Sequence, residues 1–127
     1  MLIENRWGPF RSTAYFISEY MEGSDIYNLL HSNGAKDISQ EEIIDLTGAL
    51  LRMLADASIS HGDFKATNFI FSNRNLFIID LDAMREHRFR WRFRRAFRRD
   101  LKRFRQNWTD SPIIDKLFLD QINKLKF

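Results

Sequence analysis

One stretch decides the fold, and it reads His61-Gly62-Asp63-Phe64-Lys65-Ala66-Thr67-Asn68 before an apolar run, then Leu76-Phe77-Ile78-Ile79-Asp80-Leu81-Asp82. The apolar runs predict strands over residues 68–72 and 76–80, joined by residues 73–75 as a β-hairpin. A short loop lets Asp63 and Asn68 face the same point, and the hairpin brings Asp80 back beside them. Residues 61–82 therefore predict a single polar site.

The order of these polar residues points to phosphoryl transfer. Kinase-like enzymes present an aspartate base, an asparagine five residues later and a second aspartate after a hairpin, and the last two bind magnesium. Each piece alone is ordinary turn chemistry, since Asp and Asn commonly cap loops. All three in this order favour a catalytic loop over residues 61–68 and a metal motif over residues 80–82.

Length and composition predict one ordinary domain. The chain has 127 residues, 44% of them hydrophobic, with 12 Phe to fill a core. It contains no Cys, which fits a reducing cytoplasm and excludes disulfides and thiolate metal sites. The N-terminus lacks the pattern of a signal peptide, and no apolar run approaches the ~20 residues of a membrane helix. We expect a soluble or peripheral protein.

Charge is concentrated in one segment. Residues 85–105 hold ten Arg and one Lys against Glu86 and Asp100, a net charge of +9. Because the whole chain carries +3, the remainder carries −6. A strongly basic face of this kind is either solvated or meets an anionic partner.

The flanking sequence predicts an α+β fold that is mostly helical. Residues 1–12 are expected to be irregular, and residues 13–20 to form a strand. A short helix should follow a cap at Ser24 or Asp25 and end at Asn33-Gly34, and a capping box at residues 39–42 should open a longer one. The expected buried positions of the longer helix are Ile43, Leu46, Thr47, Leu50, Met53, Leu54 and Ala57.

Two more helices are predicted after the hairpin. In the first, an apolar stripe opposes arginines at residues 88, 92, 95, 99 and 103, and the stripe consists of Phe89, Phe93, Phe97, Leu101, Phe104 and Trp108. Residues 109–112 end that helix, and Pro112 opens the last one. The inner side of the last helix should carry Ile114, Leu117, Phe118, Ile122 and Leu125.

Taken together, residues 13–108 resemble the C-terminal lobe of the bacterial lipopolysaccharide kinases, the Kdo and heptose kinase family, which are similar to protein kinases. The resemblance implies a single kinase-like lobe over residues 1–127, with the last N-lobe strand and the hinge in residues 13–23 and the helical lobe in residues 24–127. It implies ATP-dependent phosphorylation of a sugar hydroxyl, with ATP and Mg²⁺ as cofactors. The lipopolysaccharide core or a lipid A precursor would be the acceptor.

The resemblance also assigns roles to individual residues. Asp63 would accept the proton of the acceptor hydroxyl, and Lys65 would touch the transferring phosphate or simply be a solvated loop lysine. Asn68 and Asp80 would bind magnesium, and the hinge backbone at Glu19 and Met21 would bind adenine. Three further polar residues are expected to have supporting roles: His61 braces the loop, Asp82 is an outer acid or a helix cap, and Asp100 pairs with neighbours or accepts loop N–H groups.

The sequence departs from the family in one important way. Only about a dozen residues precede the expected strand at residues 13–20, which leaves no room for a glycine-rich phosphate loop or the strand lysine. We therefore expect a poor kinase unless an N-lobe, encoded upstream or carried by a partner chain, completes it. The alternative is a catalytically inactive remnant or binding protein.

The basic segment at residues 85–105 leaves a further choice open. It could contact the anionic inner membrane, so the expected location is cytoplasmic and peripheral. A nucleic-acid-binding domain is the other reading, because Phe89, Trp91 and Phe93 alternate with arginines. We disfavour it, because these aromatic residues are expected mainly on the buried stripe.

Overall fold

The computed structural model describes residues 2–7, 10–16, 22–32 and 38–127. Strands β1 (Leu2–Trp7) and β2 (Phe10–Phe16) pair antiparallel. The expected irregular lead over residues 1–12 is therefore wrong, because β1 is formed by pairing with β2, which its own sequence pattern does not reveal. The strand predicted over residues 13–20 begins earlier, at Phe10, and its residues 17–20 lie outside the described residues.

The first two helices begin at the predicted caps. The side chain of Asp25 accepts a hydrogen bond from the backbone N–H of Asn28 and caps α1 (Ile26–His31). Ser39 Oγ accepts from the N–H of Glu42 at 3.1 Å and caps α2 (Gln40–Asp56). Each contact satisfies a backbone donor that the helix itself leaves open. The predicted stop at Asn33-Gly34 lies outside the described residues.

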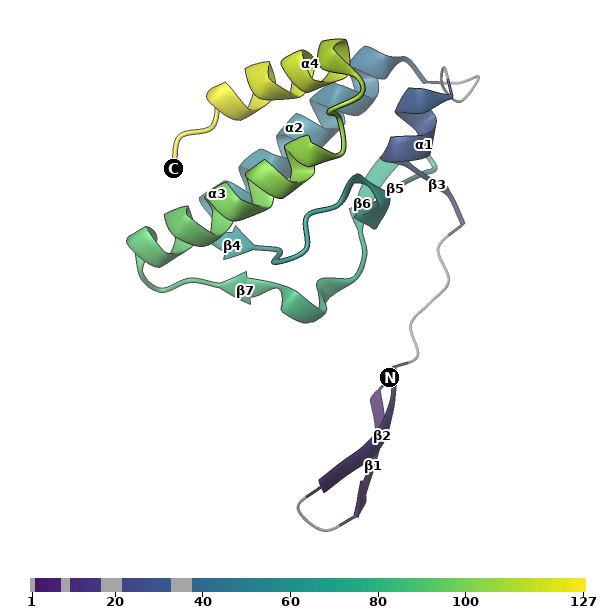
Figure 1. The fold of residues 1–127 in the computed structure, drawn as a ribbon, viewed down its shortest axis with the longest axis vertical. Helices are drawn as coiled ribbons and strands as arrows, with labels where there is room; N and C mark the ends of the chain where they lie inside the picture. The colour runs from purple at the N-terminus through teal and green to yellow at the C-terminus, as the bar shows by residue number, and fades with distance from the viewer. Residues whose placement is uncertain (1, 8–9, 17–21, 33–37) are drawn as a thin grey trace.

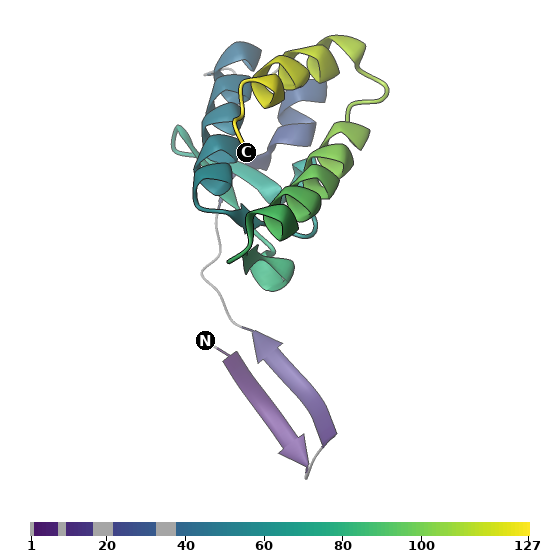
Figure 2. The same ribbon diagram turned by 90° about the vertical axis from the view of Figure 1, so that its left-hand side faces the viewer.

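Helices α3 (Arg90–Gln106) and α4 (Pro112–Asn123) complete the helical layer. In Figures 1 and 2, α4 packs beside both α2 and α3, with the short strands below them. The core between the helices is rich in aromatic rings, and its ring pairs include Phe64–Phe69 at 5.0 Å and Phe104–Phe118 at 4.9 Å. Phe64 of the predicted catalytic loop also packs on Phe104 at 5.8 Å, so these ring contacts hold the loop against α3, and α3 against α4.

Burial confirms the stripe of α3 from Phe93 onward, through Phe97, Leu101 and Phe104 to Trp108. Phe89 lies just before the helix and is 50% exposed. In α2 the predicted face was partly wrong, since Met53 is 67% exposed and Leu51 is fully buried. Met53 and Leu51 each fit a helical period with other apolar residues of α2. The pattern alone therefore could not fix the rotation of the helix about its axis.

Two small sheets hold the site. Strands β3 (Ser24–Asp25), β5 (Phe69–Ser72) and β6 (Asn75–Ile78) form one, and β4 (Ile59–Ser60) pairs with β7 (Arg85–Glu86) in the other. The hairpin β5–β6 is confirmed, but its turn has two residues, Asn73 and Arg74, both with positive φ. Pairing of β4 with β7 brings the segment after Asp80 back beside the start of the catalytic loop.

Candidate active site

His61 braces the catalytic loop, as predicted. Its side chain is fully buried, and its ring packs on Phe64 with a centroid separation of 5.5 Å. Nδ1 accepts a hydrogen bond from the N–H of Asp63 at 3.3 Å, so the proton is on Nε2, which donates to the carbonyl of Ile79 at 3.1 Å. With both nitrogens engaged, His61 positions the loop and is not available as a base.

Asp100 anchors the same loop from α3. One carboxylate oxygen accepts from the N–H of His61 at 2.8 Å, and the other from the N–H of Gly62 at 3.1 Å. This is the predicted acceptance of loop N–H groups. Burial raises the pKa of Asp100, against the opposite effect of these two backbone donors. The side chain is 4% exposed, so the loop N–H groups hold it away from solvent.

Gly62 is required where the loop turns beside residues 81–83. Its φ is +85°, a conformation that costs little only for glycine. A Cβ at this position would also lie 2.7 Å from the Cβ of Ala83. The missing side chain therefore lets the returning segment approach the loop closely.

Asp63, the predicted base, lies between two cations. Oδ2 is 2.8 Å from Lys65 Nζ, and Oδ1 is 2.7 Å from Arg103 Nη2. The hydrogen bond from Lys65 is the main cause that lowers the pKa of Asp63, with a further contribution from the charge of Arg103, while burial acts the other way. The carboxylate is thus ionised and about a quarter exposed. Lys65 is an ion-pair partner of Asp63 in this structure and is itself 46% exposed.

Asn68 connects the loop to the hairpin. Its side-chain Nδ2 donates to the backbone carbonyl of Asp63 at 2.9 Å, and its backbone carbonyl accepts from the N–H of Ile79 at 2.9 Å. Since Ile79 precedes Asp80 and also accepts from His61, both backbone groups of Ile79 tie Asp80 to the loop. The structure therefore brings Asp63, Asn68 and Asp80 into one neighbourhood.

Asp80 has a left-handed backbone, with φ 60° and ψ 61°, which is uncommon outside glycine and concentrates at functional sites. It follows β6 by two residues and occupies the cap position of the 3₁₀ helix Leu81–Ala83, without a capping hydrogen bond. The suggestion that Asp82 caps a helix is therefore wrong, because Asp82 lies inside that turn and is exposed.

Asn68 Oδ1 and the Asp80 carboxylate suit a hard cation such as Mg²⁺. The Nδ2 of Asn68 is committed to a carbonyl, which leaves Oδ1 as its remaining acceptor, and the Asp80 carboxylate makes no cap bond. In the described part of the chain no three His, Cys, Asp or Glu side chains cluster as a metal site. Two protein ligands are nevertheless usual for Mg²⁺, which keeps several waters. Glu19 and Met21 lie outside the described residues.

The profile of the lipopolysaccharide kinase (Kdo/WaaP) family matches residues 3–120. The chain belongs to this family. No curated protein matches the chain significantly. The match confirms the resemblance drawn from the predicted catalytic loop and the hairpin, and it begins within β1, which that resemblance had left out. Among the described residues of this lipopolysaccharide kinase family member, none of the helices is long and apolar enough to cross a membrane.

Sequence reasoning missed Arg103 as a residue of the site in this lipopolysaccharide kinase family member. It lies one turn after Asp100 on α3, so the two side chains emerge on neighbouring positions of one helix face. The three-residue spacing from Asp100 was the signal that could have identified Arg103. If Asp100 anchors the loop, the residue one turn later on the same helix face also lies near the loop.

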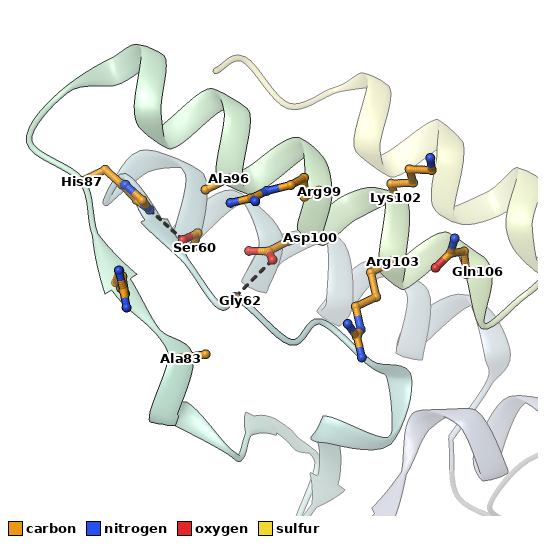
Figure 3. Close-up of a pocket in the computed structure, with 11 residues that line it drawn as sticks. Ser60, Gly62, Ala83, His87, Ala96, Arg99, Asp100, Lys102, Arg103 and Gln106 are labelled. Atoms are coloured by element: carbon orange, nitrogen blue, oxygen red, sulfur yellow. Dashed lines mark hydrogen bonds between the residues drawn. The ribbon is translucent and has the colours of Figure 1, made fainter.

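A pocket of about 630 Å³ opens between α3, the chain at Ser60 and Gly62, and residues 83–87. In Figure 3, Asp100 and Arg103 extend from α3 toward the segment that carries Ser60 and Gly62, and Ala83 lies on the ribbon facing that segment. The lining residues are Ser60, Gly62, Ala83, Arg85, His87, Ala96, Arg99, Asp100, Lys102, Arg103 and Gln106. The pocket therefore adjoins the ion pair of Arg103 with Asp63.

Proposed function

We propose that this protein carries the catalytic loop of a lipopolysaccharide-core sugar kinase, which transfers a phosphoryl group from ATP to a hydroxyl of Kdo or heptose. Residues 24–127 would be its protein-kinase-like C-terminal lobe. The observation that carries the proposal is the hydrogen-bonded connection from Asp63 through Asn68 to Ile79. It holds three oxygen-bearing side chains around one loop, which is what metal-assisted phosphoryl transfer requires.

Asp63 is the proposed base. Its lowered pKa makes it a weak proton acceptor, so its main task would be to orient the acceptor hydroxyl and take the proton late in the reaction. A positioned proton acceptor contributes roughly 10²–10⁴ in rate. Lys65, 2.8 Å from Asp63, is close enough to offset negative charge on the transferring group once its ion pair opens.

Asn68 and Asp80 are the proposed magnesium ligands, and magnesium would neutralise charge on the ATP phosphates. The Asp80 side chain is exposed after β6 and makes no capping bond, so its carboxylate is available to a cation. By the resemblance to the family, the backbone at Glu19 and Met21 would bind adenine.

Nucleotide binding is expected to be weak in the chain alone. The 127 residues contain no glycine-rich phosphate loop of the kind that covers ATP in kinases. Losing one preorganised donor at developing charge costs about 2.7–4 kcal/mol, and several would be absent. We propose that an N-terminal lobe, upstream or on a partner chain, completes the clamp.

The test is an ATP-dependent transfer assay with lipopolysaccharide-core acceptors, run on the chain alone and fused to a family N-lobe. Asp63→Asn should abolish most turnover in the fusion and preserve Mg-ATP binding, because an amide keeps the shape but cannot accept the proton. Asp80→Asn should weaken both. Asp110→Asn, an exposed residue after α3, is the matched control.

Undiminished transfer by Asp63→Asn would refute this loop as the kinase site. A fusion that transfers no phosphate, and binds no Mg-ATP, would instead favour the inactive remnant.

The start of α3 suggests a second property, contact with a membrane surface. Trp91 is 62% exposed and Phe89 50% exposed, so the expectation that Phe89 belongs to the buried stripe was wrong, while Trp91 had not been assigned to that stripe. The guanidinium of Arg92 lies 5.1 Å from the Trp91 ring and 5.5 Å from the Phe89 ring. Exposed aromatic rings among arginines suit the headgroup region of an anionic bilayer. We propose peripheral attachment through this end of the helix.

A further inference from the structure

The pocket between α3 and the catalytic loop is strongly basic. Arg85, Arg99, Lys102 and Arg103 line it, together with the polar side chains of Ser60 and His87. Ser60 Oγ and His87 Nε2 are 2.7 Å apart, so these two satisfy each other and stiffen the wall formed by β4 and β7. Arg103 is paired with Asp63, but among the described residues Arg85, Arg99 and Lys102 form no ion pair, so these three cations repel one another unless an anion is bound.

The single carboxylate in the lining does not neutralise this charge. Asp100 directs its two oxygens to the N–H groups of His61 and Gly62, and no arginine or lysine forms an ion pair with it in the described part of the chain. The pocket is therefore built to receive negative charge from outside. Its lining includes Gly62 of the catalytic loop but neither Asn68 nor Asp80, so it is separate from the proposed magnesium ligands.

Arg103 takes part in both the pocket and the ion pair with Asp63. It lines the pocket, and its Nη2 lies 2.7 Å from Asp63 Oδ1. Asp63 would need that oxygen to accept a hydrogen bond from an acceptor hydroxyl, which the ion pair obstructs. The Arg103 side chain is 48% exposed and its guanidinium sits on a flexible stem, so it can turn from one anion to another without moving α3.

We propose that this pocket binds a phosphate or carboxylate group of the acceptor, and that the bound anion draws Arg103 away from Asp63. The inference rests on the proposed function, because in it the binding of the anionic acceptor frees Asp63 to act as the base. Arg85 and Arg99 would hold the anion, and Arg103 would exchange Asp63 for it. A neutral sugar would leave the ion pair closed and Asp63 blocked.

The test uses the full chain and inorganic phosphate, followed by amide and side-chain carboxyl NMR. Phosphate should shift the signals of Ser60, Gly62, His87 and Arg99 saturably. Arg85→Gln and Arg99→Gln should each weaken phosphate binding roughly tenfold, the cost of one lost charge-assisted hydrogen bond. Arg52→Gln, an exposed arginine of α2, should bind phosphate as the wild type does. Phosphate binding of wild-type strength in a combined Arg85→Gln and Arg99→Gln variant would overturn the site.

The exchange of Arg103 has its own readout. At constant pH, phosphate should shift the carbon signal of the Asp63 carboxyl in the wild type, because a cation leaves it, and should not shift that signal in Arg103→Gln. Arg103→Lys should restore part of the effect. If phosphate fills the pocket and the Asp63 carboxyl signal stays constant, the exchange is wrong.

The source of the anion is distinguished by a second pair of ligands. Glucose 6-phosphate supplies a soluble sugar phosphate, and vesicles with phosphatidic acid supply a lipid phosphate. Saturable displacement of inorganic phosphate by either one supports the pocket and identifies its source, and displacement by neither overturns it. Because phosphate binding needs no ATP, loss of this site leaves the Asp63→Asn test of the kinase untouched.

Discussion

The Oδ2 atom of Asp100 lies 2.8 Å from the backbone nitrogen of His61, 39 residues earlier in the chain. Its other oxygen accepts from the next N–H, that of Gly62. One buried carboxylate thus fixes two consecutive peptide groups of the loop that carries Asp63. The position of the proposed base therefore depends on α3, through the residue of that helix that was predicted to accept loop N–H groups.

Asp100→Asn is expected to destabilise the protein by about 1–3 kcal/mol, because an amide nitrogen would face one of the two N–H donors and leave it without an acceptor. Urea denaturation of both proteins measures the change. Asp120→Asn, at an exposed position of α4, should change the unfolding free energy very little. Equal midpoints for the wild type and Asp100→Asn would contradict the anchoring role.

Gly62→Ala should be destabilising for two separable reasons. The backbone φ of +85° is costly for alanine, and the new Cβ would meet Ala83 at 2.7 Å. We expect a loss of roughly 1–3 kcal/mol in urea denaturation. Adding Ala83→Gly should recover part of it, because only the contact between side chains is removed. Full recovery would mean that the backbone conformation carries no cost.

The pKa of Asp63 should rise in Lys65→Met. Lys65 is the main cause of the lowered value, because its hydrogen bond favours the ionised carboxylate. A lowered pKa means that this pair stabilises the fold above the usual aspartate value of 3.8 and loses its contribution as pH falls through the lowered value. Carbon NMR titration of the Asp63 carboxyl measures the shift. Lys116→Met should leave the titration where it is, and an unmoved curve in Lys65→Met would contradict the assignment.

The ion pair between Asp115 and Arg105 is a second contact that we expect to weaken in acid. Arg105 donates to both its oxygens, at 2.9 and 2.6 Å, which lowers the pKa of Asp115. Because the pair is partly exposed, its contribution should be ~1 kcal/mol or less. The stability difference between wild type and Asp115→Asn should be constant above the usual value of 3.8 and should shrink as pH falls below it. A difference that grows on acidification would be inconsistent with this pair.

Much of this architecture could be predicted because its signals are local. Ser39 and Asp25 cap helices through neighbours three residues away, and the stripe from Phe93 to Trp108 repeats at the helical period. The order of Asp63, Asn68 and Asp80 required only a hairpin to bring the three together. These features depend on a few adjacent residues, so their pattern in the sequence is sufficient.

The features that could not be predicted depend on distant partners. Arg103 reaches Asp63 only because α3 crosses the loop, and β7 exists only through its pairing with β4. Phe89 fits the apolar stripe by spacing, but the stripe begins to be covered only at Phe93. The burial of a residue at a helix end depends on where the elements packed against that helix end. The periodicity of apolar residues does not encode this.

The exposed aromatic residues lead to the last prediction. If Phe89 and Trp91 enter the headgroup layer, the protein should sediment with vesicles of phosphatidylglycerol and phosphatidylcholine but not with phosphatidylcholine alone. Trp91→Ala and Phe89→Ala should each weaken binding roughly tenfold, since each removes a large apolar surface from the interface. Ile113→Ala, on α4 and 78% exposed, is the control, because it also removes an exposed apolar side chain. Tighter binding to single-stranded RNA than to these vesicles, with the same dependence on Trp91 and Phe89, would contradict a membrane role and restore the nucleic-acid alternative.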